Sequence, residues 1–240
     1  MNRLSQPARW LILAASLAAI AGCFRLLWGQ PAEGASAIRY GLRLGIVVFG
    51  LVAWFVSQSL ISSRGPKPGA IADQVHELTA PLHAYLQAHP RSANATLIAS
   101  SALIDLMGIF LIGASVFGPS MRPFAALIFL FAMRQACQAL CALPTPPGMI
   151  WRHPGFPSLL VTYDVANDFF FSGHTAIAVL AAIEAAQVLP GWLAAAVAAV
   201  AAVETSVVLV LRAHYTMDVF AAIAAACCAA GLGHWVCAGW

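Results

Sequence analysis

Long apolar stretches alternate with short polar ones along most of this chain. Six of the stretches have about 20 residues, enough for a helix to cross the roughly 30 Å hydrocarbon layer of a membrane. In the 240-residue sequence these spans fall at 41–61, 96–117, 123–142, 173–189, 192–211 and 215–236. One further apolar segment, 10–28, precedes them. The pattern predicts an all-α protein: a polytopic membrane helical bundle with a six-span core and an extra N-terminal hydrophobic helix.

The first apolar segment has two interpretations. Arg3 and Arg9 precede it, and Ile20-Ala21-Gly22-Cys23 has the form of a lipoprotein cleavage site. Because hydrophobic residues continue beyond that site, we favour an uncleaved helix or interfacial segment. We therefore expect an N-terminal helix and linker at 1–40 and a six-helix membrane domain at 41–240.

Composition supports the membrane class and narrows the partners. Hydrophobic residues make up 61% of the chain and charged residues 9%, against about 25% in soluble domains. The 12 Lys and Arg residues are scattered, so we expect no nucleic-acid partner. The six cysteines lie in or beside apolar segments, and we interpret them as small core residues. Metal ligation by Cys137 and Cys141, four residues apart, is the alternative.

The connections place all candidate chemistry on one side of the membrane. Residues 62–95 and 143–171 form two long polar or proline-rich loops, whereas 118–122 and 190–191 are tight turns. Counting crossings puts both long loops and the turn at 212–214 on the same side. Within the first loop, 73–86 is expected to form an interfacial amphipathic helix.

Two histidines stand at the starts of apolar spans on that side. Asp218 follows His214 by four residues, one helical turn, and a carboxylate there fixes an imidazole tautomer. Ser172 is a suitable N-cap for a helix that begins at Gly173 and His174, and the free amides of such a helix start bind anions. A solvated or capping His–Asp pair is the alternative. The combination favours a nucleophile or base, a second histidine as acid, and a phosphate site.

Positive charge is available near these histidines. Arg134, Arg152 and Arg212 are expected on the same side, where they would bind phosphate oxygens or act as interfacial anchors. A metal site would draw its ligands from His174, His214, Asp218 and Asp168, but neighbouring arginines would repel a divalent cation. We therefore expect neither a metal ion nor another cofactor.

Two carboxylates fall within predicted spans. Glu184 lies ten residues after His174, and Glu204 lies ten residues before His214. A charge in lipid is costly, so both should face inward, with at least one of them protonated or paired. We expect them to bond to each other or to a serine such as Ser206, or else to line a wet substrate cavity.

The chain resembles the sphingomyelin synthase family, within the type 2 phosphatidic acid phosphatase superfamily. The matching pieces are Asp168-x-x-x-Ser172-Gly173-His174-Thr175, His214-Tyr215-Thr216-x-Asp218-Val219, and Arg134 followed by Leu143-Pro144-Thr145-Pro146-Pro147-Gly148. The resemblance implies transfer of a phosphocholine or phosphoethanolamine head group from a phospholipid to ceramide or a related lipid alcohol. It implies catalytic roles for His174, His214 and Asp218, and phosphate or head-group binding by Ser172, Gly173, Thr175, Asp168, Arg134, Arg212 and Tyr215.

In this implied mechanism His214 attacks phosphorus to form a phosphohistidine, Asp218 orients it, and His174 protonates the leaving oxygen and later deprotonates the acceptor. The chain departs from the family pattern at Ala166-Asn167, where Cys-Gly is usual, and at Ala213, where an acidic residue is usual. Asp73 is similar in place to the family's loop aspartate, although the Pro-Pro-Leu-Pro before it is missing.

Two other functions stay open. One is a hydrolase of the same superfamily, either a lipid phosphatase or a phospholipase C-type enzyme, and the other is a non-catalytic lipid-binding bundle. For all three we expect an integral membrane protein. The family resemblance favours an active site facing away from the cytoplasm, and the Ala-rich chain suggests a bacterial inner membrane with the site on the periplasmic side.

Overall fold

The hydropathy pattern predicts the helices of this protein closely. The computed structural model describes residues 37–62, 69, 71–163 and 169–238, which form eight helices and no strand. Five of the helices are long and apolar enough to cross a membrane: α2 (Ala37–Ser62), α5 (Pro90–Phe117), α6 (Arg122–Leu140), α8 (Gly191–Val210) and α9 (Thr216–Cys237). The expected all-α class is confirmed, and the protein is an integral membrane protein.

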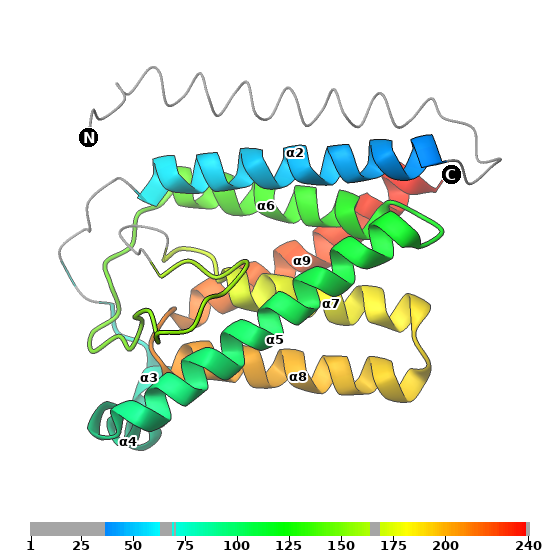
Figure 1. Ribbon diagram of the computed structural model, residues 1–240. Helices are drawn as coiled ribbons and strands as arrows, with labels where there is room; N and C mark the ends of the chain where they lie inside the picture. The colour runs from blue at the N-terminus through cyan, green and yellow to red at the C-terminus, as the bar shows by residue number, and fades with distance from the viewer. Residues whose placement is uncertain (1–36, 63–68, 70, 164–168, 239–240) are drawn as a thin grey trace.

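The sixth predicted span is shorter than a membrane-crossing helix. α7 (Gly173–Val188) is apolar but has 16 residues, which is about 24 Å at 1.5 Å per residue. The preceding loop enters the bundle before the helix starts, and Figure 1 shows α7 beginning deeper in the molecule than the neighbouring end of α8. The start of α7 is therefore recessed from the end of the neighbouring α8.

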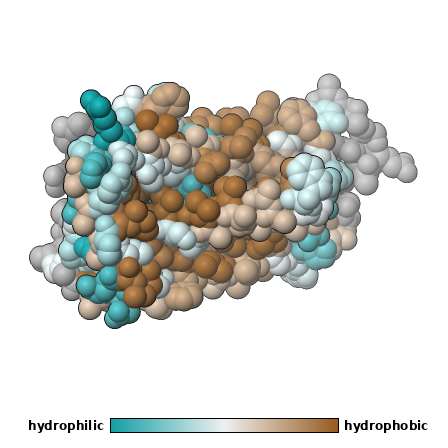
Figure 2. Space-filling model, turned by 90° about the horizontal axis from the view of Figure 1, so that it is seen from below, coloured by the Kyte–Doolittle hydropathy of each residue, from teal (hydrophilic) through white to brown (hydrophobic). Residues whose placement is uncertain are grey.

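All the candidate chemistry lies at one end of the bundle, as the count of crossings predicts. In Figure 1, α2, α6 and α8 finish at the left, where α5, α7 and α9 begin and where both long loops lie. Figure 2 shows a hydrophobic belt across the middle of the molecule and hydrophilic residues gathered mainly at this same end. We call it the loop end.

The first long connection contains more helix than expected. The predicted interfacial helix is split into α3 (Gln74–Leu78) and α4 (Ala80–Ala88), because Pro81 has no amide hydrogen to continue the hydrogen-bond ladder. α5 starts at Pro90, six residues before the predicted span, because its polar first turns stay helical beyond the apolar part.

The core lies between α5, α6, α7 and α9. The expected close approach of helices through small residues is clearest where α6 meets α9. A Cβ built on Gly233 would lie 2.9 Å from the backbone nitrogen of Ala126, so a larger residue there would push the two helices apart. The turns at 118–122 and 190–191 join helices that pack side by side, as predicted.

The second long loop is fastened to α5 by a carboxylate that the sequence analysis missed. Asp105 accepts hydrogen bonds from the hydroxyl of Ser158 and from the amides of Leu159 at 2.8 Å and Leu160 at 2.9 Å. The side chain of Leu160 occupies the space that a Cβ on Gly108 would need. The loop is thus held against the side of a membrane helix.

None of the five cysteines that the structure describes is fully buried, contrary to expectation, although Cys137 packs against the core; Cys23 lies outside the described residues. Cys141, Cys227 and Cys228 are exposed, and Cys137 and Cys237 are half-buried. The interpretation as small core residues is therefore wrong for Cys141, Cys227 and Cys228.

The two membrane carboxylates face inward as predicted, and one of them, Glu204, bonds to a serine as expected, whereas Glu184 pairs with an arginine that was not expected. Glu184 is 2% exposed and binds the guanidinium of Arg122 through Nη2 at 2.8 Å and Nε at 3.0 Å. Glu204 is 1% exposed and accepts a hydrogen bond from the hydroxyl of Ser100 at 2.6 Å. Ser206 instead donates to the carbonyl of Ala202 on its own helix. Glu184 therefore connects α7 to α6, and Glu204 connects α8 to α5.

These partners predict different effects of the same substitution. Glu184→Gln removes the counter-charge of Arg122 and should reduce the free energy of unfolding by roughly 1.5–3 kcal/mol. Glu204→Gln keeps an oxygen that accepts from Ser100 and should change it by less than about 1 kcal/mol. Thermal unfolding midpoints in one detergent would test this, and equal losses in the two variants would contradict the assignment.

Candidate active site

The turn between α8 and α9 holds His214 outside both helices. α8 ends at Val210 and α9 begins at Thr216, so His214 does not share a helix with Asp218 as the four-residue spacing suggests. Arg212 has a left-handed φ of 53°, which non-glycine residues rarely adopt, and the chain reverses there. The imidazole is thus presented by a short turn.

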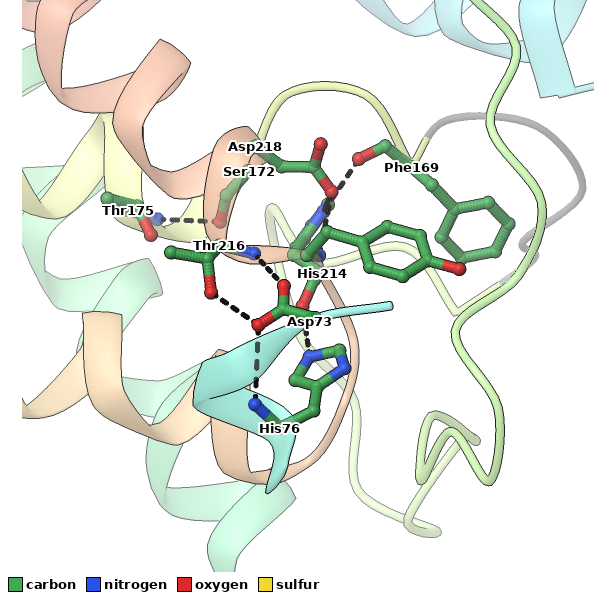
Figure 3. A network of polar contacts seen from close by, with 9 residues as sticks. Asp73, His76, Phe169, Ser172, Thr175, His214, Thr216 and Asp218 are labelled. Atoms are coloured by element: carbon green, nitrogen blue, oxygen red, sulfur yellow. Dashed lines mark hydrogen bonds and ion pairs between the residues drawn. The ribbon is translucent and has the colours of Figure 1, made fainter. Parts of the chain in front are cut away.

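A backbone carbonyl orients the imidazole of His214. Its Nδ1 lies 3.0 Å from the carbonyl oxygen of Phe169 and 3.6 Å from Oδ2 of Asp218 (Figure 3). Since a carbonyl oxygen only accepts hydrogen bonds, Nδ1 must carry the proton and donate it. In the neutral imidazole this leaves the lone pair on Nε2, which is the state a nucleophile needs.

Asp218 serves the turn and the imidazole together. Its side chain is fully buried, and Oδ2 accepts the backbone N–H of Tyr215 at 2.8 Å, which caps the start of α9. The same oxygen is the one nearest His214. A fixed negative charge beside the ring stabilises an imidazolium as positive charge develops on it.

The start of α7 is built under strain and tied to α9. Ser172 is the N-cap, as predicted, and its hydroxyl accepts the amide of Thr175 at 3.3 Å. Phe171, buried at 1% exposure, has a left-handed φ of 99°, which is costly for an aromatic residue. The amide of Ser172 donates to the carbonyl of Asp218 at 3.3 Å. This hydrogen bond connects the motif at 168–175 directly to the motif at 214–219.

One pocket brings both histidines together. Its lining combines loop, α2, α5, α6 and α7 residues: Trp54, Ile104, Phe131, Arg134, Trp151, Leu160, Val161, Thr162, Phe169, Gly173, His174, Ile177, Ala213 and His214. The ring of His174 meets Trp151 edge-on, with centroids 5.1 Å apart. Nε2 of His174 has no hydrogen-bond partner within the described part of the chain. It is therefore left for a hydrogen bond with a molecule bound in the pocket.

Arg134 supplies the positive charge of this pocket. It is 7% exposed, and its Nη1 donates to the side chain of Gln58 on α2. A Cβ at Gly173 would lie 3.4 Å from Nε of Arg134, so the glycine leaves room for the guanidinium beside the first turn of α7. A guanidinium and a helix N-terminus both favour an anion, so a phosphate suits this corner.

Four other residues expected to bind phosphate or head group, Ser172, Thr175, Arg212 and Tyr215, do not line this pocket. Ser172 and Thr175 are fully buried in the start of α7, and the ring of Tyr215 stacks on His76 with centroids 5.7 Å apart. Arg212 donates to the carbonyl oxygens of Pro147 at 3.0 Å and His76 at 3.4 Å. Asp168 lies outside the described residues.

Arg152 also points elsewhere. Its Nη2 donates to the side-chain oxygen of Asn94 at the start of α5, in an exposed position at 2.8 Å. Arg152 is thus a surface contact, as the interfacial alternative proposed.

The sequence analysis missed how α3 and α4 bind the turn at 210–216. His83 donates through Nδ1 to the carbonyl of Val210 at 2.8 Å, and His76 donates through Nε2 to the carbonyl of His214 at 2.9 Å. Asp73 accepts from the amide of Thr216 at 2.6 Å. The available signals were the amphipathic pattern of 73–86 and the resemblance of Asp73 to the family's loop aspartate, and neither indicated these partners.

Two of these side chains have shifted pKa values. Burial opposes ionisation of Asp73, but hydrogen bonds from Thr216 and His76 outweigh it and hold the pKa of its carboxyl below the usual range. Burial lowers the pKa of His83, and the nearby guanidinium of Arg212 lowers it further. At neutral pH the carboxylate is charged and His83 is neutral.

Comparison with known protein families matches residues 72–234 to the family described as AtPDCT1/2. The match covers more than half of the chain and both histidine motifs. The chain belongs to the AtPDCT1/2 family. This is a plant family of phosphatidylcholine:diacylglycerol cholinephosphotransferases, related to sphingomyelin synthases and type 2 phosphatidic acid phosphatases. No curated protein and no solved structure gave a match.

The family assignment refines the expectation from the sequence. The superfamily was predicted correctly, and AtPDCT1/2 is a relative of the sphingomyelin synthases. Membership in this family of lipid phosphocholine transferases supports an enzyme. Because the family is a plant family, it gives no support to a bacterial inner membrane. Among the described residues, no three His, Cys, Asp or Glu side chains gather where they could hold a metal ion.

The pocket geometry predicts that Arg134 binds the phosphate and Arg152 does not. Arg134→Ala should weaken inhibition by orthovanadate roughly 10- to 100-fold, the equivalent of one lost hydrogen bond to a charged group. Arg152→Ala removes the exposed hydrogen bond to Asn94 and is the matched control. Orthovanadate should inhibit this variant as strongly as it inhibits the wild type. Equal inhibition constants for all three proteins would contradict a phosphate site at Arg134.

Proposed function

We propose that this protein transfers a phosphocholine or phosphoethanolamine head group from a phospholipid to a lipid alcohol through a phosphohistidine on His214. The acceptor is diacylglycerol, the alcohol in the family's description, or a related lipid alcohol such as ceramide. The catalytic unit is the six-helix domain 41–240. The observation that carries the proposal is the pocket in which His174, His214 and Arg134 meet at the loop end.

The first half of the reaction follows from the state of His214. Nε2 attacks the phosphorus of the donor lipid, and the bond from phosphorus to the diacylglycerol oxygen breaks. His174 gives a proton to that leaving oxygen. The new bond places positive charge on the imidazole, which Asp218 at 3.6 Å stabilises while the carbonyl of Phe169 keeps Nδ1–H in place.

The second half reverses these steps with another alcohol. The acceptor hydroxyl gives its proton to His174 as its oxygen attacks the phosphohistidine, and the bond from phosphorus to Nε2 breaks. Arg134 compensates the negative charge on the phosphate oxygens in both halves. The site therefore needs no metal ion or other cofactor to balance the reaction.

The surroundings of the histidines favour an alcohol over water as acceptor. Trp54, Phe131, Trp151 and Phe169 give the pocket an aromatic lining, and the start of α7 is recessed from the end of α8. A recessed apolar site excludes bulk water and admits a lipid hydroxyl from the membrane. Hydrolysis is the competing outcome, and it would return the free phospho-head-group.

An assay with labelled lipids separates these outcomes. The purified protein, supplied with phosphatidylcholine carrying a labelled phosphate and with diacylglycerol or ceramide, should form a labelled phospholipid from the acceptor. Release of labelled phosphocholine or inorganic phosphate alone would identify a hydrolase. Absence of both products would support a non-catalytic lipid-binding bundle and contradict the proposal.

The roles of His214 and Asp218 predict losses of rate of different size. His214→Ala removes the nucleophile and should abolish turnover. Asp218→Asn leaves an oxygen to cap α9 but removes the charge, so the rate should fall by about 10²- to 10⁴-fold with the fold intact. Steady-state kinetics and circular dichroism check this, and wild-type turnover in His214→Ala would disprove the assignment.

Ala213 lines the pocket, so a carboxylate introduced at this position should change which head group the enzyme prefers. A carboxylate at this position would face the ammonium group of the substrate. Ala213→Glu should therefore raise the ratio of phosphoethanolamine to phosphocholine transfer, because a primary ammonium gains more from hydrogen bonds than a quaternary one. Ala213→Gln is the uncharged control. An unchanged ratio would mean that other residues select the head group.

A further inference from the structure

We infer that Asp73 is a positioning residue that holds the turn bearing His214 in its reactive orientation. This inference rests on the proposed function only in naming His214 as the nucleophile. The side chain lies at the start of α3, far in sequence from the histidine motifs, and it does not line the pocket. Its effect on the reaction must therefore pass through the turn.

Both oxygens of Asp73 bind the first residue of α9. Oδ2 accepts the amide of Thr216 at 2.6 Å, and Oδ1 accepts the hydroxyl of the same residue at 2.7 Å (Figure 3). Oδ1 also accepts the amides of Val75 at 2.9 Å and His76 at 3.3 Å. The carboxylate thus joins the N-termini of two helices, α3 and α9.

The peptide units on the C-terminal side of His214 are fixed by neighbouring residues of α3. His76 donates to the carbonyl of His214 at 2.9 Å, and Asp73 binds the amide of Thr216 two residues after the histidine. On the other side, the ring of His214 is held by the carbonyl of Phe169. The imidazole therefore has a defined direction only while the turn and the loop before α7 keep their relative places.

The chemistry of the contact requires a carboxylate. One side chain must accept from two groups of Thr216 and two further amides, and only an ionised carboxyl has lone pairs enough on both oxygens. Bonds from amides to a charged acceptor are also the stronger kind. An asparagine has one acceptor oxygen, and its amide group would face the donor that the second oxygen now binds.

Four variants test the role of this contact by kinetics. Asp73→Asn should lower kcat about 10- to 100-fold with KM within about twofold, because misplacement of a reacting group affects chemistry more than binding. Thr216→Val removes the hydroxyl alone and should lower kcat less. The double variant should lose less than the product of the two single losses, since both remove the same contact. Thr216→Ser keeps the hydroxyl and should restore most of the rate.

Hydrogen exchange gives a measurement that does not depend on turnover. The backbone amide of Thr216 should exchange faster in Asp73→Asn than in wild type, while amides in the middle of α9 keep their protection. Glu184→Gln, destabilised at a distant ion pair, is the control for loss of stability alone. It should keep wild-type kcat at a temperature well below its unfolding midpoint.

The outcomes distinguish this inference from the proposed function. If the wild type transfers no head group but Asp73→Asn still loses protection at Thr216, the proposed function fails and the positioning role stands. Wild-type kcat and wild-type exchange in Asp73→Asn would overturn the positioning role. So would a loss of kcat in Glu184→Gln equal to that in Asp73→Asn, because the effect would then be general destabilisation.

Discussion

The helix ends at the loop end of the bundle carry backbone groups that need hydrogen-bond partners. The side chains that supply these partners also determine the arrangement of the site. The last carbonyls and first amides of a helix have no partner within it, and few waters reach them at a membrane boundary. Here α8 ends and α7 and α9 begin within a small region. Their free groups are bound by His83 at Val210, His76 at His214, Asp73 at Thr216 and Asp218 at Tyr215. Side chains that satisfy the backbone thus also fix the direction of the candidate nucleophile.

The same arrangement fits a lipid substrate. The pocket lies at the recessed start of α7, and the segment 158–163 is held against α5 by Asp105, which places Leu160, Val161 and Thr162 in the pocket wall. Charge is concentrated at Arg134, while the rest of the lining is mainly apolar and aromatic. A phosphate near the membrane surface, with its acyl chains beside the bundle, matches this distribution.

The sequence predicts the helices and both histidine motifs because each depends on local pattern. Hydropathy finds spans of about 20 residues, and the capping role of Ser172 follows from residue type and position. Long-range partners leave no such signal: Asp73 meets Thr216 and Asp105 meets Leu160 only in the folded chain. Tyr215 lies in a motif and Arg212 just before it, yet neither lines the pocket: Arg212 binds carbonyl oxygens of Pro147 and His76, and the ring of Tyr215 stacks on His76. Spacing gives a residue's place along the chain, but not the partners of its side chain.

The central claim is that Nε2 of His214 attacks phosphorus because the carbonyl of Phe169 holds the proton on Nδ1. The direct measurement is to trap the labelled intermediate by rapid acid-free quenching, isolate the peptide containing residue 214, and determine by ³¹P–¹⁵N NMR which ring nitrogen carries the phosphoryl group. The account predicts a phosphoryl group on Nε2 of His214. A phosphoryl group on Nδ1, or on His174 in place of His214, would contradict it.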